Sequence, residues 1–473
     1  MHGTNCQRAR TIPDNNAPMR EGHRWLTLAT LCIGVLIAQV DTSVVNLAVQ
    51  PIGSDLQADV GALQWVVDSY NLVYAVLLLS GGLLADLYGR RLTFMAGAAV
   101  FTAASLLCAF APSTAILVGG RALTGVGAAL LLPASLAIIR VAWPDAKERA
   151  RAMGIWAGCN GLAFVIGPTL GGMLIARFGW RSIFLVVVPF GLTALTLAPP
   201  AIAESSDPHG RHFDAAGQLF GALAPGGFAV AAIESHGAWQ AAIGALALAA
   251  LSLGLFLKIE ARRGDAALVP PDIFRAPAFR GAMVATTGMT FGMYGVLFLT
   301  PLTWQNAGML GPIGAGVGLM PMAVVFMLVS PFSGALKGKF GTAALTGGGV
   351  AVIGCGLLLI GAMAPARSIA ATEIGLTLTG LGMGLATGPL MDTAVSTVRT
   401  ARAGTAAALI NVARMVGATV GVAVLGAVFA LGGGETYGLL LAMLLGGTVQ
   451  LASAAVVWMA TRLATDHERP EPS

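Results

Sequence analysis

The chain has 473 residues, of which 56% are hydrophobic and only 10% are charged. Almost none of the charges lie inside a series of long apolar runs, which excludes an ordinary soluble enzyme or binding domain. The net charge of +5 does not indicate nucleic-acid binding, because the basic residues lie between the runs.

Fourteen apolar runs are each long enough to cross a hydrocarbon core of about 30 Å, which takes roughly 20 helical residues. In lipid every backbone polar group must be satisfied within its own segment, so we expect helices. The first run is too long for the apolar core of a signal peptide and is expected to be retained. The expected spans are 25–49, 61–84, 92–110, 114–139, 151–176, 182–201, 214–234, 239–258, 281–304, 313–336, 342–364, 369–393, 404–431 and 437–461.

The distribution of lysine and arginine predicts the orientation. We assign 22 of the 27 basic residues to the termini and the even-to-odd connections, three to the opposite face, and two to spans. Basic residues accumulate on the cytoplasmic side of membrane proteins, so both termini are expected in the cytoplasm.

Sites for other chemistry are not indicated. The five cysteines are scattered without a CxxC pair, and the six histidines lie outside the spans. We therefore predict no metal site, no cofactor, no catalytic residues and no enzyme activity. A primary pump is also disfavoured, because the nearest approach to a phosphate-binding loop, Gly334–Lys339, has the wrong spacing.

An internal repeat divides the chain. Gly89 is matched by Gly341 at an offset of 252 residues, and Asn160 by Asn411 at an offset of 251. A near-constant offset indicates duplication. The sequence predicts an all-α polytopic membrane protein with two six-helix halves and two inserted spans. The expected units are 1–205, 206–275 and 276–473.

A glycine-rich segment with charges follows the second span: Gly82, Asp86, Gly89, Arg90 and Arg91. It resembles the cytoplasmic signature between spans 2 and 3 of the major facilitator superfamily. The resemblance implies a loop that stabilises one access state by bridging the halves. We expect Asp86 to meet nearby cations and the N-terminal dipole of span 3.

Span 4 contains a buried arginine within Leu117-x-x-x-Arg121-x-x-x-Gly125-x-Gly127, which resembles a second signature of that superfamily. An arginine in lipid costs at least about 2.5 kcal/mol and needs a partner. The resemblance implies that Arg121 assists proton transfer against an acid on span 1. A purely structural ion pair is the alternative.

Span 5 carries Gly167, Pro168, Gly171 and Gly172 in a pattern that resembles the superfamily's antiporter motif. Pro168 interrupts a helical hydrogen bond, and the small face lets another helix approach. A generic proline kink is the alternative interpretation.

Two aspartates lie within the first two spans. Gln64, Asp68 and Asn71 share one helical face, which we expect to line a cavity. A carboxyl in such a place can exchange a proton near neutral pH, because burial disfavours its charged form. Asp41 is the first candidate proton carrier and Asp68 the second, unless Asp68 lies near the outer water.

The substrate cavity is expected at the interface of the two halves. The predicted lining residues are Gln64, Asn71, Asn160, Asp392, Asn411 and Arg414. Asp392 and Arg414 are equally well explained as a static ion pair.

Together these motifs narrow the resemblance to the 14-span drug:proton antiporter family. It implies a monomeric proton-coupled exporter of small hydrophobic or amphipathic compounds in the cytoplasmic membrane of a bacterium, with the substrate, protons and the bilayer as its partners. This chain departs from the family in span 13, which offers Asn411 and Arg414 where several members carry acids. An uptake symporter and a non-transporting receptor remain alternatives.

Overall fold

The computed structural model describes residues 21–206, 215–234, 239–263, 271–398 and 403–467, and these ranges are almost entirely helical. The first seven helices are α1 (Glu21–Leu56), α2 (Val60–Tyr88), α3 (Arg90–Ala109), α4 (Thr114–Ala142), α5 (Ala146–Phe178), α6 (Ser182–Leu185) and α7 (Val187–Ala201). A pair follows, α8 (Ala215–Ile233) and α9 (Trp239–Arg263). The remaining elements are η3 (Pro271–Arg275), α10 (Pro277–Asn306), α11 (Pro312–Val329), η4 (Ser330–Phe332), α12 (Ser333–Phe340), α13 (Thr342–Met363), α14 (Ile369–Ser396), α15 (Ala403–Leu431) and α16 (Thr436–His467).

The described residues contain 11 helices that are long and apolar enough to cross a membrane, or up to 12 if the bent helix α2 is one span. Two shorter apolar helices, Val165–Phe178 and Ala216–Ala231, lie within α5 and α8. The chain is therefore an all-helical, multi-pass membrane protein, and the expected count of fourteen spans is not confirmed.

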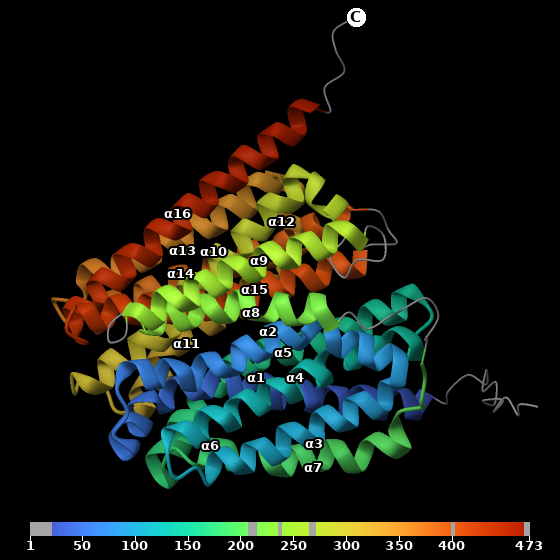
Figure 1. The fold of residues 1–473 in the computed structure, drawn as a ribbon, viewed down its shortest axis with the longest axis horizontal. Helices are drawn as coiled ribbons and strands as arrows, with labels where there is room; N and C mark the ends of the chain where they lie inside the picture. The colour runs from blue at the N-terminus through green and yellow to red at the C-terminus, as the bar shows by residue number, and fades with distance from the viewer. Residues whose placement is uncertain (1–20, 207–214, 235–238, 264–270, 399–402, 468–473) are drawn as a thin grey trace, which may run out of the picture.

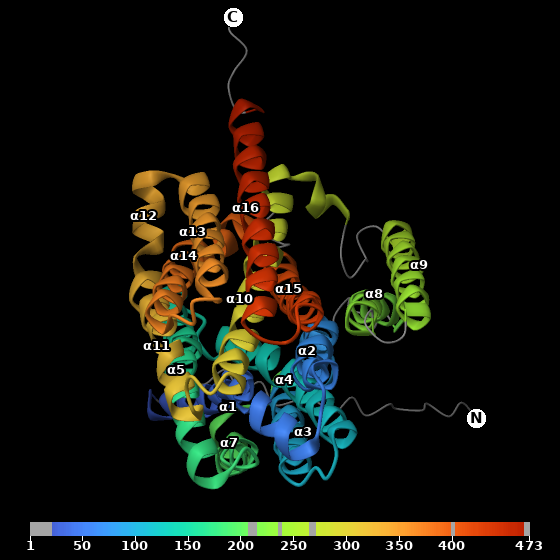
Figure 2. The same cartoon turned by 90° about the vertical axis from the view of Figure 1, so that its left-hand side faces the viewer.

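The helices form two bodies and a lateral pair. Helices α1 to α7 make the lower body in Figure 1, and α10 to α16 make the upper body. In Figure 2 the α8–α9 pair lies on one side of the bundle next to α2 and α15, while α5 and α11 meet on another side. The two bodies thus touch along α2–α15 and α5–α11.

The junction between α2 and α3 is shorter than the sequence suggests. Helix α2 continues to Tyr88, so the segment expected as a loop is helical and only Gly89 separates the two helices. Gly89 has φ 116° and its repeat counterpart Gly341, between α12 and α13, has φ 86°. Both values lie where a side chain is strained, so each turn needs glycine.

Prolines divide two of the expected spans. Span 182–201 is split into α6 and α7, because Pro189 has no N–H for the carbonyl of Leu185, where α6 ends. Span 313–336 is split into α11 and α12 by η4, which contains Pro331. The sequence analysis missed both breaks, since the apolar pattern runs through them.

Successive helices alternate in direction, so the bundle has two ends. We call the end that holds the α1–α2 connection the Leu56 end, and the end that holds Gly89 and Gly341 the Gly89 end. Two side-chain amides cross between the bodies near the Leu56 end. Gln64 Nε2 donates to the carbonyls of Val422 and Ala423 at 3.0 and 2.9 Å, and Gln305 Nε2 donates to the Leu47 carbonyl at 3.1 Å.

At the Gly89 end, several glycines of α5 and α12 face open space. A Cβ added at Gly154 or Gly158 of α5, or at Gly334 or Gly338 of α12, would meet no atom within 4 Å. The bonds of Gln64 and Gln305 between the bodies lie at the opposite end. These glycines therefore face open space, and the side-chain bonds of Gln64 and Gln305 join the bodies near the Leu56 end.

Candidate functional site

Asp41 of α1 and Arg121 of α4 form an ion pair in which each side chain is 1% exposed. Arg121 also donates from Nε to the carbonyl of Val66 on α2 at 3.1 Å, and its guanidinium lies 4.7 Å from the ring centroid of Tyr70. The expected pairing of Arg121 with an acid of the first span is present. One cation thus holds α1, α2 and α4 together in the interior.

Glycines of α4 allow the approach that this pair needs. A Cβ on Gly125 would lie 2.7 Å from the carbonyl oxygen of Tyr70, and one on Gly127 would lie 2.7 Å from the backbone nitrogen of Phe101. Any side chain at these positions would push α4 away from α2 and α3. The glycine spacing after Arg121 is therefore a packing requirement of the site.

Asp68 is fully buried, and neither of its carboxyl oxygens has a hydrogen-bond partner. An ionised carboxylate buried without a partner is costly. The alternative that places Asp68 near outer water is wrong, because the residue has 0% exposure. Gln64 and Asn71 on the same face are also buried, so this stripe faces protein rather than lipid.

Three tyrosines extend the polar centre from one body to the other. Tyr70 stacks on Tyr74 at 6.0 Å between ring centroids, four residues along α2. Tyr74 in turn interacts electrostatically with Arg414 of α15 and with Tyr294 of α10. We call Tyr70, Tyr74, Tyr294 and the two arginines the central band. The sequence analysis missed the tyrosines, since an aromatic residue in an apolar run usually belongs to the core.

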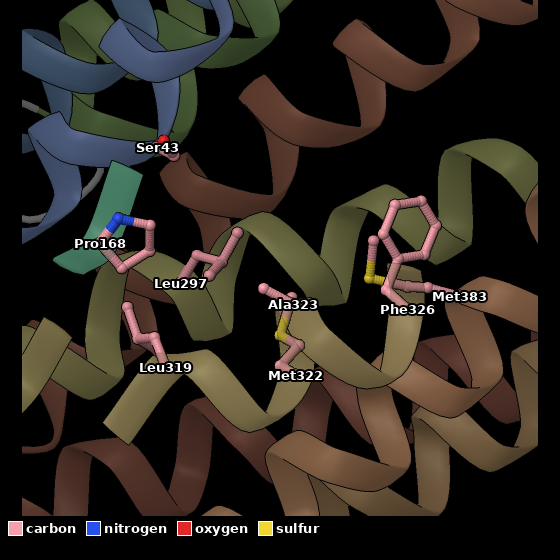
Figure 3. Close-up of a pocket in the computed structure, with 8 residues that line it drawn as sticks. All are labelled: Ser43, Pro168, Leu297, Leu319, Met322, Ala323, Phe326 and Met383. Atoms are coloured by element: carbon pink, nitrogen blue, oxygen red, sulfur yellow. The ribbon is translucent and has the colours of Figure 1, made fainter. Parts of the chain in front are cut away.

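An apolar pocket lies between the bodies among α1, α5, α10, α11 and α14, with about 370 Å³ of empty space that includes open solvent. Figure 3 shows Ser43 and Pro168 at one end and Phe326 with Met383 at the other. The lining residues are Ser43, Pro168, Leu297, Leu319, Met322, Ala323, Phe326 and Met383. Methionine side chains adapt to differently shaped apolar ligands. The sequence gives no signal for these residues, because apolar side chains that line a pocket resemble those that face lipid.

Comparison with known proteins identifies the family of the chain. The sequence model of the Major Facilitator Superfamily matches residues 31–422, most of the chain. The chain belongs to this superfamily.

The proteins similar to this chain include bacterial resistance proteins. The chain is 36% identical over 408 residues to the multidrug resistance protein Stp of Mycobacterium tuberculosis, covering 86% of this chain and 76% of that protein. It is 33% identical to the methylenomycin A resistance protein of Bacillus subtilis, covering 91% and 93%. The solved structure of the POT family transporter PepTSo has the same fold, with a TM-score of 0.71 at 15% identity over 93% of this chain and 99% of that one.

The superfamily motif of α5 forms the contact between the bodies. A Cβ on Gly172 would lie 2.7 Å from the carbonyl oxygen of Pro312, and Gly316 of α11 lies against the carbonyl of Pro168. Gly167 and Gly171 face α1, where their Cβ positions collide with Ser43 and Val44 respectively. Both faces of α5 thus need small residues near the Leu56 end.

The superfamily motif at the Gly89 end is built differently from the expectation. Asp86 pairs with Arg90 at 2.9 Å, but the N-terminus of α3 is met by Glu204, which accepts from the backbone N–H groups of Arg91 and Leu92 at 3.0 and 3.1 Å. Asp86 thus meets the nearby cation that was expected, while Glu204 accepts the N–H bonds at the start of α3. Glu204 was missed because it lies in a polar connection far along the chain.

The remaining predicted residues are spread out. Asp392 pairs with Lys337 at the Gly89 end and not with Arg414, so the static pair is wrong. Asn411 donates to the Ala407 carbonyl of its own helix at 3.1 Å. Asn160 lies in α5, and its side chain is outside the part that the structure describes.

Proposed function

We propose that this protein is a proton-coupled antiporter that exports small hydrophobic or amphipathic compounds by alternating access. The membership of the superfamily, the similarity to bacterial resistance proteins and the apolar pocket between two bodies support this proposal. The observation that carries it is the buried pair of Asp41 and Arg121.

The pair supplies a binding place for a proton. When a proton binds the Asp41 carboxylate, its attraction for the Arg121 guanidinium is lost. Arg121 then retains the Val66 carbonyl, the Thr124 hydroxyl at 3.5 Å and the ring of Tyr70 as partners. Protonation therefore frees α1 from a cation that stays attached to α2. Asp68, which is buried without a partner, is the second proton site.

The position of Arg121 links the proton to the contact between the bodies. Its bond to Val66 lies two residues from Gln64, whose amide holds α15 at the Leu56 end. Release of α1 from Arg121 changes the support of α2 at this place, and α2 carries one of the contacts between the bodies. Opening of the Leu56 end and closing of the Gly89 end complete the exchange.

The orientation follows from the charges. With the basic residues in the cytoplasm, the Gly89 end opens to the cytoplasm and the Leu56 end is closed to the outside. In this conformation cargo enters from the cytoplasm. Moving one charge across 100 mV supplies about 2.3 kcal/mol, which corresponds to roughly 50-fold accumulation per proton.

The finer architecture belongs to the same proposal. Helices α5 and α8, added to the long spans, give fourteen crossings with both termini in the cytoplasm. The units 1–205, 206–275 and 276–473 are two halves and an inserted pair. The protein acts as a monomer in the bacterial inner membrane and needs no nucleic acid or cofactor.

The test has two steps. Expression in an efflux-deficient bacterial host, challenged with a compound panel, identifies compounds to which the chain confers resistance. Everted vesicles that maintain a pH gradient are then given such a compound, and release of the stored protons is followed with a pH-sensitive dye.

We expect proton release with the unaltered chain and none with Asp41→Asn. Uptake without proton release would exclude antiport. Proton movement in the opposite direction would indicate a symporter, and resistance that Asp41→Asn leaves intact would favour a receptor role.

A further inference from the structure

Arg414 lies in the middle of α15, where two tyrosines from different bodies approach it. Tyr74 comes from α2 and Tyr294, which is 6% exposed, comes from α10. The Nε atom of Arg414 is buried and has no hydrogen-bond partner. A phenol group offers a guanidinium only a dipole and a ring face, so the positive charge is not neutralised.

The three acids that the sequence analysis placed at the proton site or the cavity do not reach Arg414. Asp41 pairs with Arg121, Asp68 has no hydrogen-bond partner, and Asp392 pairs with Lys337 at the Gly89 end. No carboxylate among the described residues forms an ion pair with Arg414. Arg414 therefore carries a partly buried positive charge between the bodies.

The position of this charge relates it to the apolar pocket. Leu297 lines the pocket and lies three residues after Tyr294 on α10, so both belong to neighbouring turns of one helix surface. An amphipathic molecule placed in the pocket can thus direct a polar group toward Arg414. A carboxylate matches a guanidinium in both charge and hydrogen-bond geometry.

We propose that Arg414 binds an acidic group of the cargo, so that the exported compounds are carboxylate-bearing amphiphiles rather than lipophilic cations. This inference rests on the proposed function and names the chemical class that the same cavity accepts. The cargo supplies a counter-charge that the described residues do not provide at Arg414. Tyr74 and Tyr294 flank the acidic group, and the methionines of the pocket hold its apolar part.

The test uses three probes that share one apolar body: 2-naphthoate, its neutral methyl ester, and the cation 2-naphthylmethylammonium. Binding to the purified chain in lipid nanodiscs is measured by probe fluorescence. We expect the unaltered chain to bind the naphthoate at least about 10-fold more tightly than the cation. Arg414→Gln should remove this preference, and Arg414→Lys should keep most of it.

A matched control removes a charge elsewhere. Lys337→Gln changes the net charge by the same amount but lies at the Gly89 end, so the preference for the anion should persist. Size-exclusion chromatography and circular dichroism show whether each variant is folded. Equal losses for all three probes in Arg414→Gln, stronger binding of the cation by the unaltered chain, or binding of no probe would each overturn the inference.

A transport experiment tests the anionic cargo and the proton antiport separately. Entry of one proton and export of one anion each transfer one positive charge equivalent into the cell, so the exchange moves two net charges. Exchange of one proton for a monovalent cation moves no net charge. Voltage set with potassium and valinomycin should therefore accelerate naphthoate export. Proton release driven by the cation alone would refute the anionic cargo while leaving antiport intact, and absence of proton release with every probe would refute antiport itself.

Discussion

The two arginines of the central band have different surroundings, and Arg121 is buried whereas Arg414 is partly exposed. Arg121 in the N-terminal body has a carboxylate partner, a backbone carbonyl and a tyrosine ring. Arg414 in the C-terminal body has two phenol groups and a buried Nε without a partner. The stack of Tyr70 on Tyr74 lies between the two arginines. It connects Arg121, which has an ion-pair partner, with Arg414, which has none among the described residues.

The difference between the two arginines suggests that they have different roles in transport. A buried ion pair that can lose one of its charges by protonation acts as a switch. Under the proposed mechanism, a cation without a counter-ion among the described residues would select the cargo. The N-terminal body would then bind the proton and the C-terminal body the cargo, with α2 in contact with both.

The largest effect is expected for Asp41→Asn. Arg121 keeps its charge but loses its ionic partner, which costs about 3–5 kcal/mol for a buried pair and removes the group that binds the proton. Coupled export should fall by about 100-fold or more, as measured by substrate-driven proton release in everted vesicles. Asp55→Asn on the same helix is the control, since Asp55 is half exposed and pairs with Arg181. Equal losses in both variants would contradict a special role for Asp41.

A smaller effect is expected for Gly172→Ala, which tests whether the two bodies must meet at the Leu56 end. The new Cβ would lie 2.7 Å from the Pro312 carbonyl oxygen, so α5 and α11 would be pushed apart. We expect transport to fall by about 10-fold, since overpacking a tight contact costs about 1–3 kcal/mol. Gly158→Ala on the same helix should have little effect, because its Cβ would meet no atom within 4 Å. Normal transport by Gly172→Ala would show that this contact is dispensable.

Gln64→Leu removes two hydrogen bonds between α2 and α15 while keeping a similar volume. At about 0.5–1.5 kcal/mol for each bond, the closed Leu56 end should lose roughly 5- to 100-fold in population. Accessibility of a cysteine introduced nearby to an impermeant thiol reagent measures the change. Gln50→Leu, which loses only a bond to Ser54 of its own helix, is the control. Unchanged labelling in Gln64→Leu would mean that the amide does not hold the end closed.

The smallest effect is expected from the tyrosine hydroxyls, and it sharpens the contrast between the two arginines. Tyr74→Phe keeps the ring stack but removes a hydroxyl that interacts electrostatically with Arg414, so affinity for 2-naphthoate should fall by about 3-fold. Tyr70→Phe should leave this affinity unchanged, since the hydroxyl of Tyr70 contacts the Ala38 carbonyl of α1. The reverse ranking in a fluorescence titration would place the acidic group at Arg121 instead.

Much of the architecture follows from the sequence because lipid imposes simple rules. Long apolar runs must be helices, and a buried Arg121 must find an acid, which leaves few candidates near it. The same reasoning placed Gln64, Asp68 and Asn71 inside the protein. These predictions rest on the cost of burying polar groups, which does not depend on the details of packing.

The details that depend on tertiary contacts were not predictable. Tyr74 and Tyr294 can be recognised as candidate site residues only because α2 and α10 place them near Arg414. Glu204 reaches α3 from a connection more than a hundred residues away. The breaks at Pro189 and Pro331 interrupt apolar runs without changing their hydropathy. The hydropathy pattern therefore does not predict them.

The most direct test of proton exchange at Asp41 is a count of protons released per bound compound. The purified chain in nanodiscs is titrated calorimetrically, near neutral pH, with a compound to which it confers resistance, in buffers of different ionisation enthalpy. The coupling scheme predicts about one proton released per compound bound by the unaltered chain and none by Asp41→Asn. Equal proton release by both proteins, or binding without release by the unaltered chain, would contradict it.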